Sequence, residues 1–386
     1  MNKYIYPFNL IITFAHFLII FYASKVSTYE VGIYSFINAI LGILIPTATF
    51  EGTNHYISKL ITKNELESWS KSTNTILTIV LISIGTSLFL YSNLLALSLI
   101  LINCINLYIN WSLALEEPEL RLKKGYNNIF KKNSFINQLF FRFLLQFFLI
   151  IILGLGYQNN LLLKFFILLE ILIFSRISFI KIGVIKNPLK NKLPPIKYFL
   201  NVLLDKIEGS ILIFAVSFIS GFDTLGNLQL GLTISKSFQI LTKPFIRFEY
   251  VNLYSKSFLK KAINYSFFSY VVYLLFPLIL LFLENYFQIL NYSLNPFIFI
   301  LICLYSGNDN SKELIKGIYL VLGDLRKNIK FKVFLILINL FIFVIQIILK
   351  NILPFSLILI IIPFIFSDLF FTLNQLKKCK KINDSR

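Results

Sequence analysis

Charged side chains interrupt stretches of this sequence that are otherwise apolar. The set comprises Arg142, Asp205, Lys206, Glu208, Lys236 and Lys312. A charge near the middle of a bilayer costs about 2.5–3.5 kcal/mol on insertion scales. Facing lipid, the three charges at Asp205, Lys206 and Glu208 would cost on the order of 8–10 kcal/mol, as much as the stability of a whole domain. We therefore predict that these side chains face protein or a water-filled cavity.

The chemistry that this set predicts is the binding of an anion. The charges are mixed in sign but lean basic, and fixed cations suit a substrate with phosphate or carboxylate groups. Asp205 and Glu208 would hold the cations in place or take up a coupling ion. The predicted substrate-binding residues are Arg142, Lys206, Lys236, Lys312, Asn106 and Gln138.

Polar residues recur at helical spacing within several apolar stretches, which places them on one helix face. Hydrogen bonding between packed helices is the structural alternative for such stripes, and it applies equally to Asn106. For His16, a packed histidine is the alternative to a proton relay. Lys243, Lys316 and Arg176 stand near the ends of their stretches, where long side chains extend to the interface. The stripes include Asn9, Thr13 and His16; Asn103, Asn106 and Asn110; and Gln138, Arg142 and Gln146.

The elements that must position these residues are membrane-spanning helices. Of the 386 residues, 57% are hydrophobic and 14% are charged, whereas soluble domains carry roughly 25% charged residues. A span needs about 20 mostly apolar residues. The sequence predicts an all-α polytopic membrane protein with twelve spans, at 4–24, 31–50, 75–92, 94–115, 135–155, 161–181, 198–220, 226–246, 263–283, 294–320, 331–349 and 353–373.

Basic residues alternate between the two sides of the predicted spans. The loops that follow even-numbered spans carry clusters of Lys and Arg, as does the C-terminal tail, whereas the opposite loops hold only Lys25 and Lys350. Basic loops stay in the cytoplasm. We therefore expect both termini to be cytoplasmic, in a multi-pass protein of a bacterial cytoplasmic membrane that attracts anionic lipids.

Several classes of function lack their sequence signals. The net charge of +19 is spread over short loops, so no compact basic domain is available for nucleic acid. The chain has no phosphate-binding loop motif and no Cys or His spacing typical of a metal site. We expect no cofactor and no metal. We also expect no enzyme activity, because a membrane polymerase or ligase would display catalytic residues on a larger outer loop than this sequence predicts.

A faint repeat divides the chain into two halves. An apolar helix, a short acidic turn and a second helix occur around Val31-Gly32 and again around Leu225-Gly226, followed by Pro46 and Pro244. Both units follow an even number of spans, so the repeat is parallel. We predict an N-terminal lobe at 1–183 with spans 1–6, and a C-terminal lobe at 184–386 with spans 7–12 and a short basic cytoplasmic tail.

Several segments resemble those of a known family. The segment Tyr29-Glu30-Val31-Gly32-Ile33-Tyr34-Ser35 with Glu51-Gly52, the triplet Leu204-Asp205-Lys206, and the segment Gly221-Phe222-Asp223-Thr224-Leu225-Gly226-Asn227-Leu228 are similar to those of Wzx-type polysaccharide repeat-unit flippases. Leu228 departs from the aromatic residue that the family has there. Gly323-Asp324 and Lys327-Asn328 resemble the late helical hairpin of the family. These flippases belong to the MOP superfamily, which also contains MATE exporters.

The resemblance implies two six-helix lobes around a central cavity that opens alternately to each side. It implies an O-antigen-type substrate, an oligosaccharide linked to a polyprenyl pyrophosphate, and H⁺ or Na⁺ as a coupling ion. It also implies polysaccharide polymerase and chain-length proteins as partners. Two alternatives remain open. One is a MATE-like multidrug or ion exporter, which would favour an acidic cavity. The other is a polytopic membrane enzyme acting on lipid-linked sugars.

Overall fold

All the elements that the structure describes are helices. The computed structural model describes residues 5–49, 79–90, 92–105, 133–154, 160–179, 196–249, 268, 270–275, 277–279, 296–321, 325–350 and 357–384. Each of the twelve predicted spans contains helical residues among these, and no strand occurs in them. The predicted all-α fold class of a polytopic membrane protein is therefore confirmed.

The chain forms two compact units, Met1–Lys206 and Ile207–Arg386, and the boundary between them falls within α8. The predicted boundary at 183/184 lies outside the described residues, and the equivalence of the two lobes stays a prediction. The first unit contains α1 (Ile5–Val26), α2 (Thr28–Thr49), the helical segments 79–90 and 94–105, α6 (Asn133–Gly154), α7 (Asn160–Phe179) and the start of α8 (Ile196–Ser220). The second contains the rest of α8, α9 (Phe222–Glu249), the segment 270–275, α11 (Pro296–Val321), α12 (Leu325–Lys350) and α13 (Leu357–Asp384).

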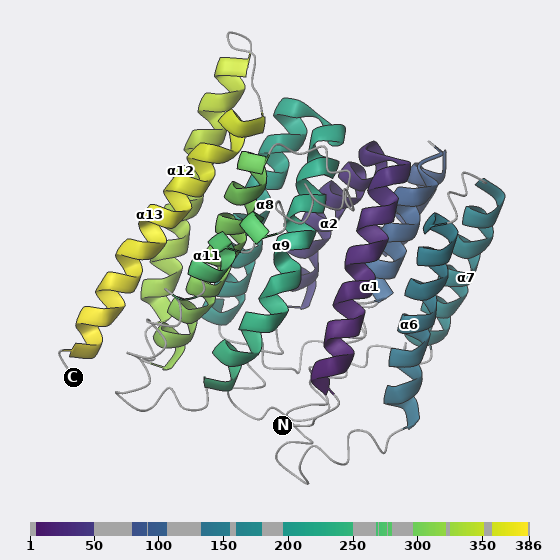
Figure 1. The fold of residues 1–386 in the computed structure, drawn as a ribbon, viewed down its shortest axis with the longest axis horizontal. Coiled ribbons are helices and arrows are strands. Elements are labelled where there is room, and N and C mark those ends of the chain that lie inside the picture. Colours follow the sequence, from purple (N-terminus) through teal and green to yellow (C-terminus); the bar gives the residue numbers. More distant parts are fainter. Residues whose placement is uncertain are drawn as a thin grey trace. The chain divides into compact units, whose positions relative to one another are not determined.

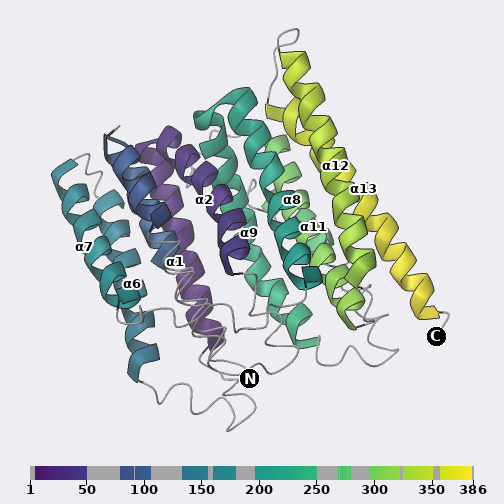
Figure 2. The same cartoon turned by 180° about the vertical axis from the view of Figure 1, so that it is seen from behind.

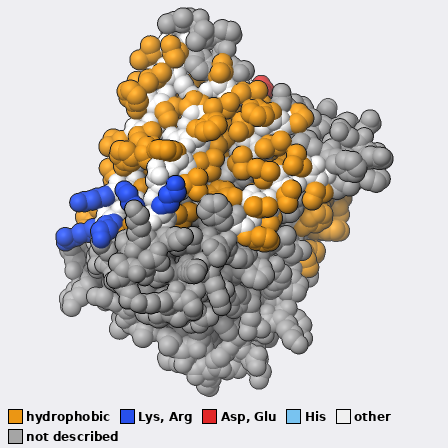
Figure 3. All heavy atoms as spheres, turned by 60° about the vertical axis from the view of Figure 1, so that its left-hand side comes forward, with side chains coloured by type: hydrophobic (Ala, Val, Ile, Leu, Met, Phe, Trp, Pro, Cys, Tyr) orange, Lys and Arg blue, Asp and Glu red, His pale blue; other side chains and the backbone are white. Residues whose placement is uncertain are grey.

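Helix α12 is polar on its inner face and apolar on its outer face. The exposed side chains on its outer face include Leu337, Phe341 and Ile348, at 59%, 66% and 62% exposure. The buried face carries Asn328, Lys332, Asn339 and Gln346. Figure 3 shows the apolar surface of this part of the molecule, with Lys and Arg side chains gathered along one border. Because soluble helices place these faces the other way round, α12 is built for lipid.

The first unit repeats this arrangement in α7. Leu161, Phe165, Leu168 and Leu172 are exposed along one face, whereas Glu170 on the opposite face is buried. Two stretches of the described chain are long and apolar enough to cross a membrane without help from undescribed residues, Arg326–Lys350 and Leu357–Lys378. Shorter apolar helices of 10–17 residues occur at Phe14–Val26, Thr28–Leu44, Ile79–Leu90, Leu94–Ile105, Phe143–Gly154, Tyr270–Ile279 and Pro296–Asp309.

Within each unit, neighbouring helices lie side by side. In the first, α1 packs against α2 and α6, and α6 against α7. The ends of α1 and α6 meet where Gly154 lies against the ring of Tyr22, so the first and fifth predicted spans run in the same direction. In the second, α11 packs against α9, α12 and α13. The pairs α6–α7 and α12–α13 remain side by side in both views (Figures 1 and 2).

Two helix pairs share the same one-residue break. Between α1 and α2, the amide of Ser27 donates to the Ala23 carbonyl at 2.9 Å and the amide of Val31 donates to the Ser27 carbonyl at 3.2 Å. Between α8 and α9, the amide of Gly221 donates to the Ser217 carbonyl and the amide of Leu225 to the Gly221 carbonyl, both at 3.2 Å. These breaks lie at the two turns of the predicted sequence repeat.

Some helices extend beyond their predicted ends. Helix α12 begins at Leu325, so Arg326, Lys327 and Lys330 lie on its first turns and not in a loop. Helix α13 continues to Asp384 and includes most of the basic tail. An apolar pattern marks only the part of a helix inside the hydrocarbon, whereas backbone hydrogen bonding continues through the interface.

Candidate functional site

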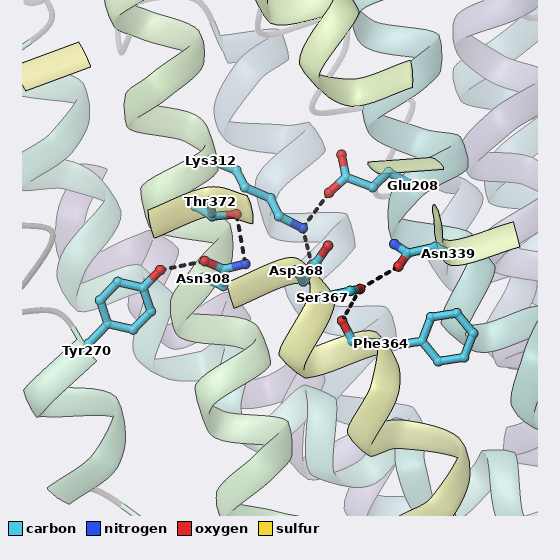
Figure 4. Close-up of polar contacts among 9 residues, drawn as sticks. All are labelled: Glu208, Tyr270, Asn308, Lys312, Asn339, Phe364, Ser367, Asp368 and Thr372. Carbon is cyan, nitrogen blue, oxygen red and sulfur yellow. Dashed lines mark hydrogen bonds and ion pairs between the residues drawn. The ribbon is translucent and has the colours of Figure 1, made fainter. Parts of the chain in front are cut away.

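Lys312 lies between two buried carboxylates in the second unit (Figure 4). Its ammonium group forms ion pairs with Glu208 of α8 and Asp368 of α13, and donates a hydrogen bond to Asp368. The side chains of Lys312, Glu208 and Asp368 are 16%, 5% and 2% exposed. We call these three residues the ion cluster. It joins three helices inside one unit.

The helices position the ion cluster through a set of neighbouring hydrogen bonds. Asn308 lies one turn before Lys312 on α11, and its side-chain amide donates to the hydroxyl of Thr372 on α13 at 3.2 Å. The hydroxyl of Tyr270 donates to the side-chain oxygen Oδ1 of Asn308 at 2.5 Å. Thr372 stands one turn after Asp368. The cluster and these bonds therefore fix α11 and α13 against each other along two successive turns.

Further polar pairs connect α9 to α11 and α12 to α13. Ser235 of α9 and Ser306 of α11 share a hydrogen bond of 2.5 Å. The hydroxyl of Ser367 donates to Asn339 of α12 at 2.8 Å. With little hydrophobic force between helices in lipid, such bonds and close packing hold a bundle together.

Close packing at Gly307 brings the segment 270–275 onto α11. A Cβ atom at Gly307 would lie 3.0 Å from Cγ of Tyr273, a residue that is completely buried. Helix α11 is continuous through Gly307. Glycine is therefore there to admit an aromatic ring, not to break the helix.

The charge of the ion cluster differs from the basic balance of the predicted site. With all three groups ionised, two carboxylates face one ammonium, which leaves one negative charge in excess. The ring of Tyr305 also lies near the ammonium, at 5.7 Å from its centroid to Nζ. Lys312 is thus a cation already neutralised by the protein, and the local environment favours positive charge.

The other predicted site residues on α8 and α9 have different surroundings. Asp205 is half-buried, whereas Lys206 and Lys236 are exposed, and all three interact with other residues. Of the predicted set, the structure therefore brings together Lys312 and Glu208. Substrate binding by any of these side chains stays a prediction.

The predicted site residues of the first unit are described in part. His16 is half-buried on α1 and has an interaction partner. Gln138 and Arg142 lie on α6, but their side chains are outside the described part of the chain. Asn106 lies outside the described residues. Asn103, from the same stripe, donates to Asn38 of α2 at 2.5 Å, which is the bonding between helices expected as the structural alternative.

The sequence reasoning missed three buried charged residues, Glu170, Lys332 and Asp368. Glu170 and Asp368 are single acids within predicted spans, at 161–181 and 353–373, and an ionisable residue inside a span is by itself a functional-site signal. Lys332 lies only two residues into its predicted span, where it resembles a residue of the interface. The signal for the two acids was therefore present, but neither belongs to a polar stripe.

Comparisons with known proteins identify no family for this chain. The sequence matches no protein-family profile and no curated protein. Among solved structures, it is similar to the outward-facing conformation of a multidrug resistance MATE family transporter of the MOP superfamily. The two share 12% of residues with a TM-score of 0.43, over 98% of this chain and 96% of the other. A likeness of this degree establishes neither a family nor an activity.

Proposed function

We propose that this protein is a membrane transporter whose working charges lie inside the bilayer. The observation that carries the proposal is the ion cluster, which is buried among helices with apolar outer faces. Replacing a buried ion pair by apolar residues is often neutral or stabilising, so a buried cluster contributes little to stability on balance. Ionisable groups inside membrane segments usually mark ion or substrate pathways.

The substrate class that we propose is an oligosaccharide linked to a polyprenyl pyrophosphate. The support is the sequence resemblance to Wzx-type flippases and the cations Arg142, Lys206 and Lys236, which would replace the water around a pyrophosphate. The polar headgroup would pass through the protein while the prenyl tail stays in lipid. The expected location is a bacterial cytoplasmic membrane with both termini inside.

Export of a cationic small molecule is the second candidate, and one observation favours it. The ion cluster holds an excess of negative charge around Lys312, so a substrate cation or a proton entering there would be stabilised. In this alternative Lys312 would leave one carboxylate when the cation binds.

Transport assays in proteoliposomes separate the two candidates. The first assay follows a fluorescent polyprenyl-pyrophosphate-linked sugar across the bilayer, and the second follows a fluorescent organic cation. Lys206→Gln and Lys236→Gln should each abolish movement of the lipid-linked sugar. The control is Lys164→Gln, an exposed lysine of α7. Movement of the cation with none of the lipid-linked sugar would replace the first candidate by the second, and movement of neither would reject both.

A further inference from the structure

A buried acid with no hydrogen-bond partner among the described residues lies midway along α7. Glu170 stands about 15 Å along α7 from its first residue, by the helix rise. Its side chain is completely buried, and neither carboxyl oxygen has a hydrogen-bond partner among the described residues. The lipid-facing residues of α7 lie on the opposite face of the helix. Glu170 therefore points into protein, not lipid.

Two other buried polar groups of the same unit also lack partners in the described part. The hydroxyl of Ser98, on the helical segment 94–105, lies beside the Glu170 carboxyl group but outside hydrogen-bonding geometry. The amide of Gln146 is buried on α6, the helix that packs against α7, and is likewise without a bond. Buried polar groups are nearly always hydrogen-bonded. Ser98 is therefore the described group with which the Glu170 carboxyl group can form a hydrogen bond.

The charged and titratable groups of the surrounding helices offer no described partner. The ammonium of Lys164 is exposed and lies over the ring of Phe89, at 5.8 Å. The segment 94–105 carries no charged residue, and its one titratable group is the buried thiol of Cys104. The side chains of Arg142 on α6 and Arg176 on α7 lie outside the described part of the chain. On α1, which packs against α6, the groups are half-buried His16, half-buried Tyr22 and exposed Lys25.

We propose that Glu170 is a proton-binding site of the first unit. An ionised carboxylate without a cation is strongly disfavoured in this apolar setting, whereas the neutral acid can donate to the adjacent Ser98 hydroxyl. When water reaches α7, the O–H bond breaks, the proton passes to water, and the carboxylate keeps the electron pair. A role of this proton in driving transport rests on the proposed function, whereas the binding of the proton to Glu170 does not.

Infrared spectroscopy of the purified full chain in lipid nanodiscs tests the site without any transport. At neutral pH the protein should show the carbonyl stretching band of a protonated carboxylic acid, and this band should shift in D₂O. Glu170→Gln should remove the band and leave the melting temperature unchanged, because the amide resembles the neutral acid in shape and charge. Ser98→Ala should shift the band without removing it. Glu30→Gln is the control and should leave the band in place.

Three outcomes would overturn the proposal. One is a spectrum in which Glu170→Gln removes no acid band. Another is a band that Na⁺ abolishes at constant pH, which would make the site a sodium site. The third is a band that occurs only after Arg142→Gln, which would mean that Glu170 is ionised and paired with Arg142. If the bands behave as expected but no substrate moves in proteoliposomes, the proposed function fails and the proton site stands.

Discussion

At the scale of single residues, the contribution of the ion cluster to stability depends on the charges of all three members. Removing one partner of a buried ion pair destabilises a protein by about 3–5 kcal/mol, since the remaining charge stays buried without an opposite charge. Removing every charge at once avoids that penalty. Single variants of Lys312, Glu208 and Asp368 should therefore lower the free energy of unfolding much more than the combined variant does.

We predict that Lys312→Met lowers the free energy of unfolding by about 3–5 kcal/mol, because it leaves Glu208 and Asp368 facing each other. The combined variant Lys312→Met, Glu208→Gln and Asp368→Asn should recover most of this loss and still be inactive in transport. Thermal unfolding in detergent measures the first effect, and proteoliposome transport measures the second. Lys164→Met is the exposed control. Wild-type transport by the combined variant would show that the cluster is structural.

The close packing at Gly307 leads to a second prediction. In Gly307→Ala the new methyl group would lie within 3.0–3.2 Å of Tyr273, whose side chain is completely buried and cannot turn away freely. We expect a loss of about 1–3 kcal/mol, typical of overpacking. Gly42→Ala is the matched control, since nothing lies within 4 Å of its Cβ position and alanine favours the helix. Equal melting temperatures for the two variants would contradict this account.

At the scale of elements, the breaks at Ser27 and Gly221 divide long helical stretches into pairs. Ser27 accepts a hydrogen bond from the amide of Glu30 at 3.2 Å and so caps α2. Gly221 has a φ of 85°, a left-handed conformation that glycine adopts freely. Different residues thus produce the same break, one by side-chain capping and one by backbone freedom.

Gly221→Ala should lower the free energy of unfolding by about 1–2 kcal/mol, because alanine is strained at this φ. Gly221→Asn should cost less, since asparagine tolerates the left-handed region. Chemical denaturation of the purified protein measures both. Gly209→Ala, at a helical glycine of α8 with nothing within 4 Å of its Cβ position, is the control. A larger loss for Asn than for Ala would argue that space, not backbone conformation, requires the glycine.

The sequence predicts elements well and pairings poorly. Periodic apolar stretches mark α7 and α12 directly, because about 20 apolar residues have few alternatives to a span. The ion-pair partners of Lys312 cannot be predicted from the sequence in this way. Glu208 is visible as one of three neighbouring charges, but Asp368 lies 56 positions from Lys312 and only the packing of α11 on α13 brings them together.

The role of Glu30 shows the same limit. The sequence marks it as part of a family-like segment, with no physical reason for an acid. In the structure its carboxylate accepts a hydrogen bond from the amide of Ala96 at 3.0 Å. Glu30 therefore caps the segment 94–105, whose first amides have no partner within the helix. Sequence spacing could not show this, because the two groups meet only through the fold.

At the scale of the whole molecule, orientation in the membrane follows from the basic residues. Within the second unit, α12 and α13 form a hairpin: Gln346 near the end of α12 donates to the carbonyls of Leu359 and Ile360 near the start of α13. Exposed Lys350 lies at this end of the hairpin, but the other exposed basic residues lie together at the opposite end. They are Arg326, Lys327 and Lys330 of α12, and Lys377 and Lys378 of α13. Basic clusters of this kind are retained in the cytoplasm.

We predict that residues 158 and 190 label from opposite sides of the membrane. Gln158 belongs to a loop that follows an odd-numbered predicted span and Lys190 to one that follows an even-numbered span, with a single span between them. The test introduces single cysteines there after replacing Cys104, Cys303 and Cys379 by serine or alanine. A membrane-impermeant thiol reagent applied to intact cells should label position 158, and position 190 should react only after lysis. Cysteine at Lys377 is an internal reference, because the basic end of α13 should label with position 190. If both loop positions react in intact cells, either the span between them or the even count of spans is wrong. The cytoplasmic placement of the termini would then fail with it, because that placement depends on the alternation of the loops.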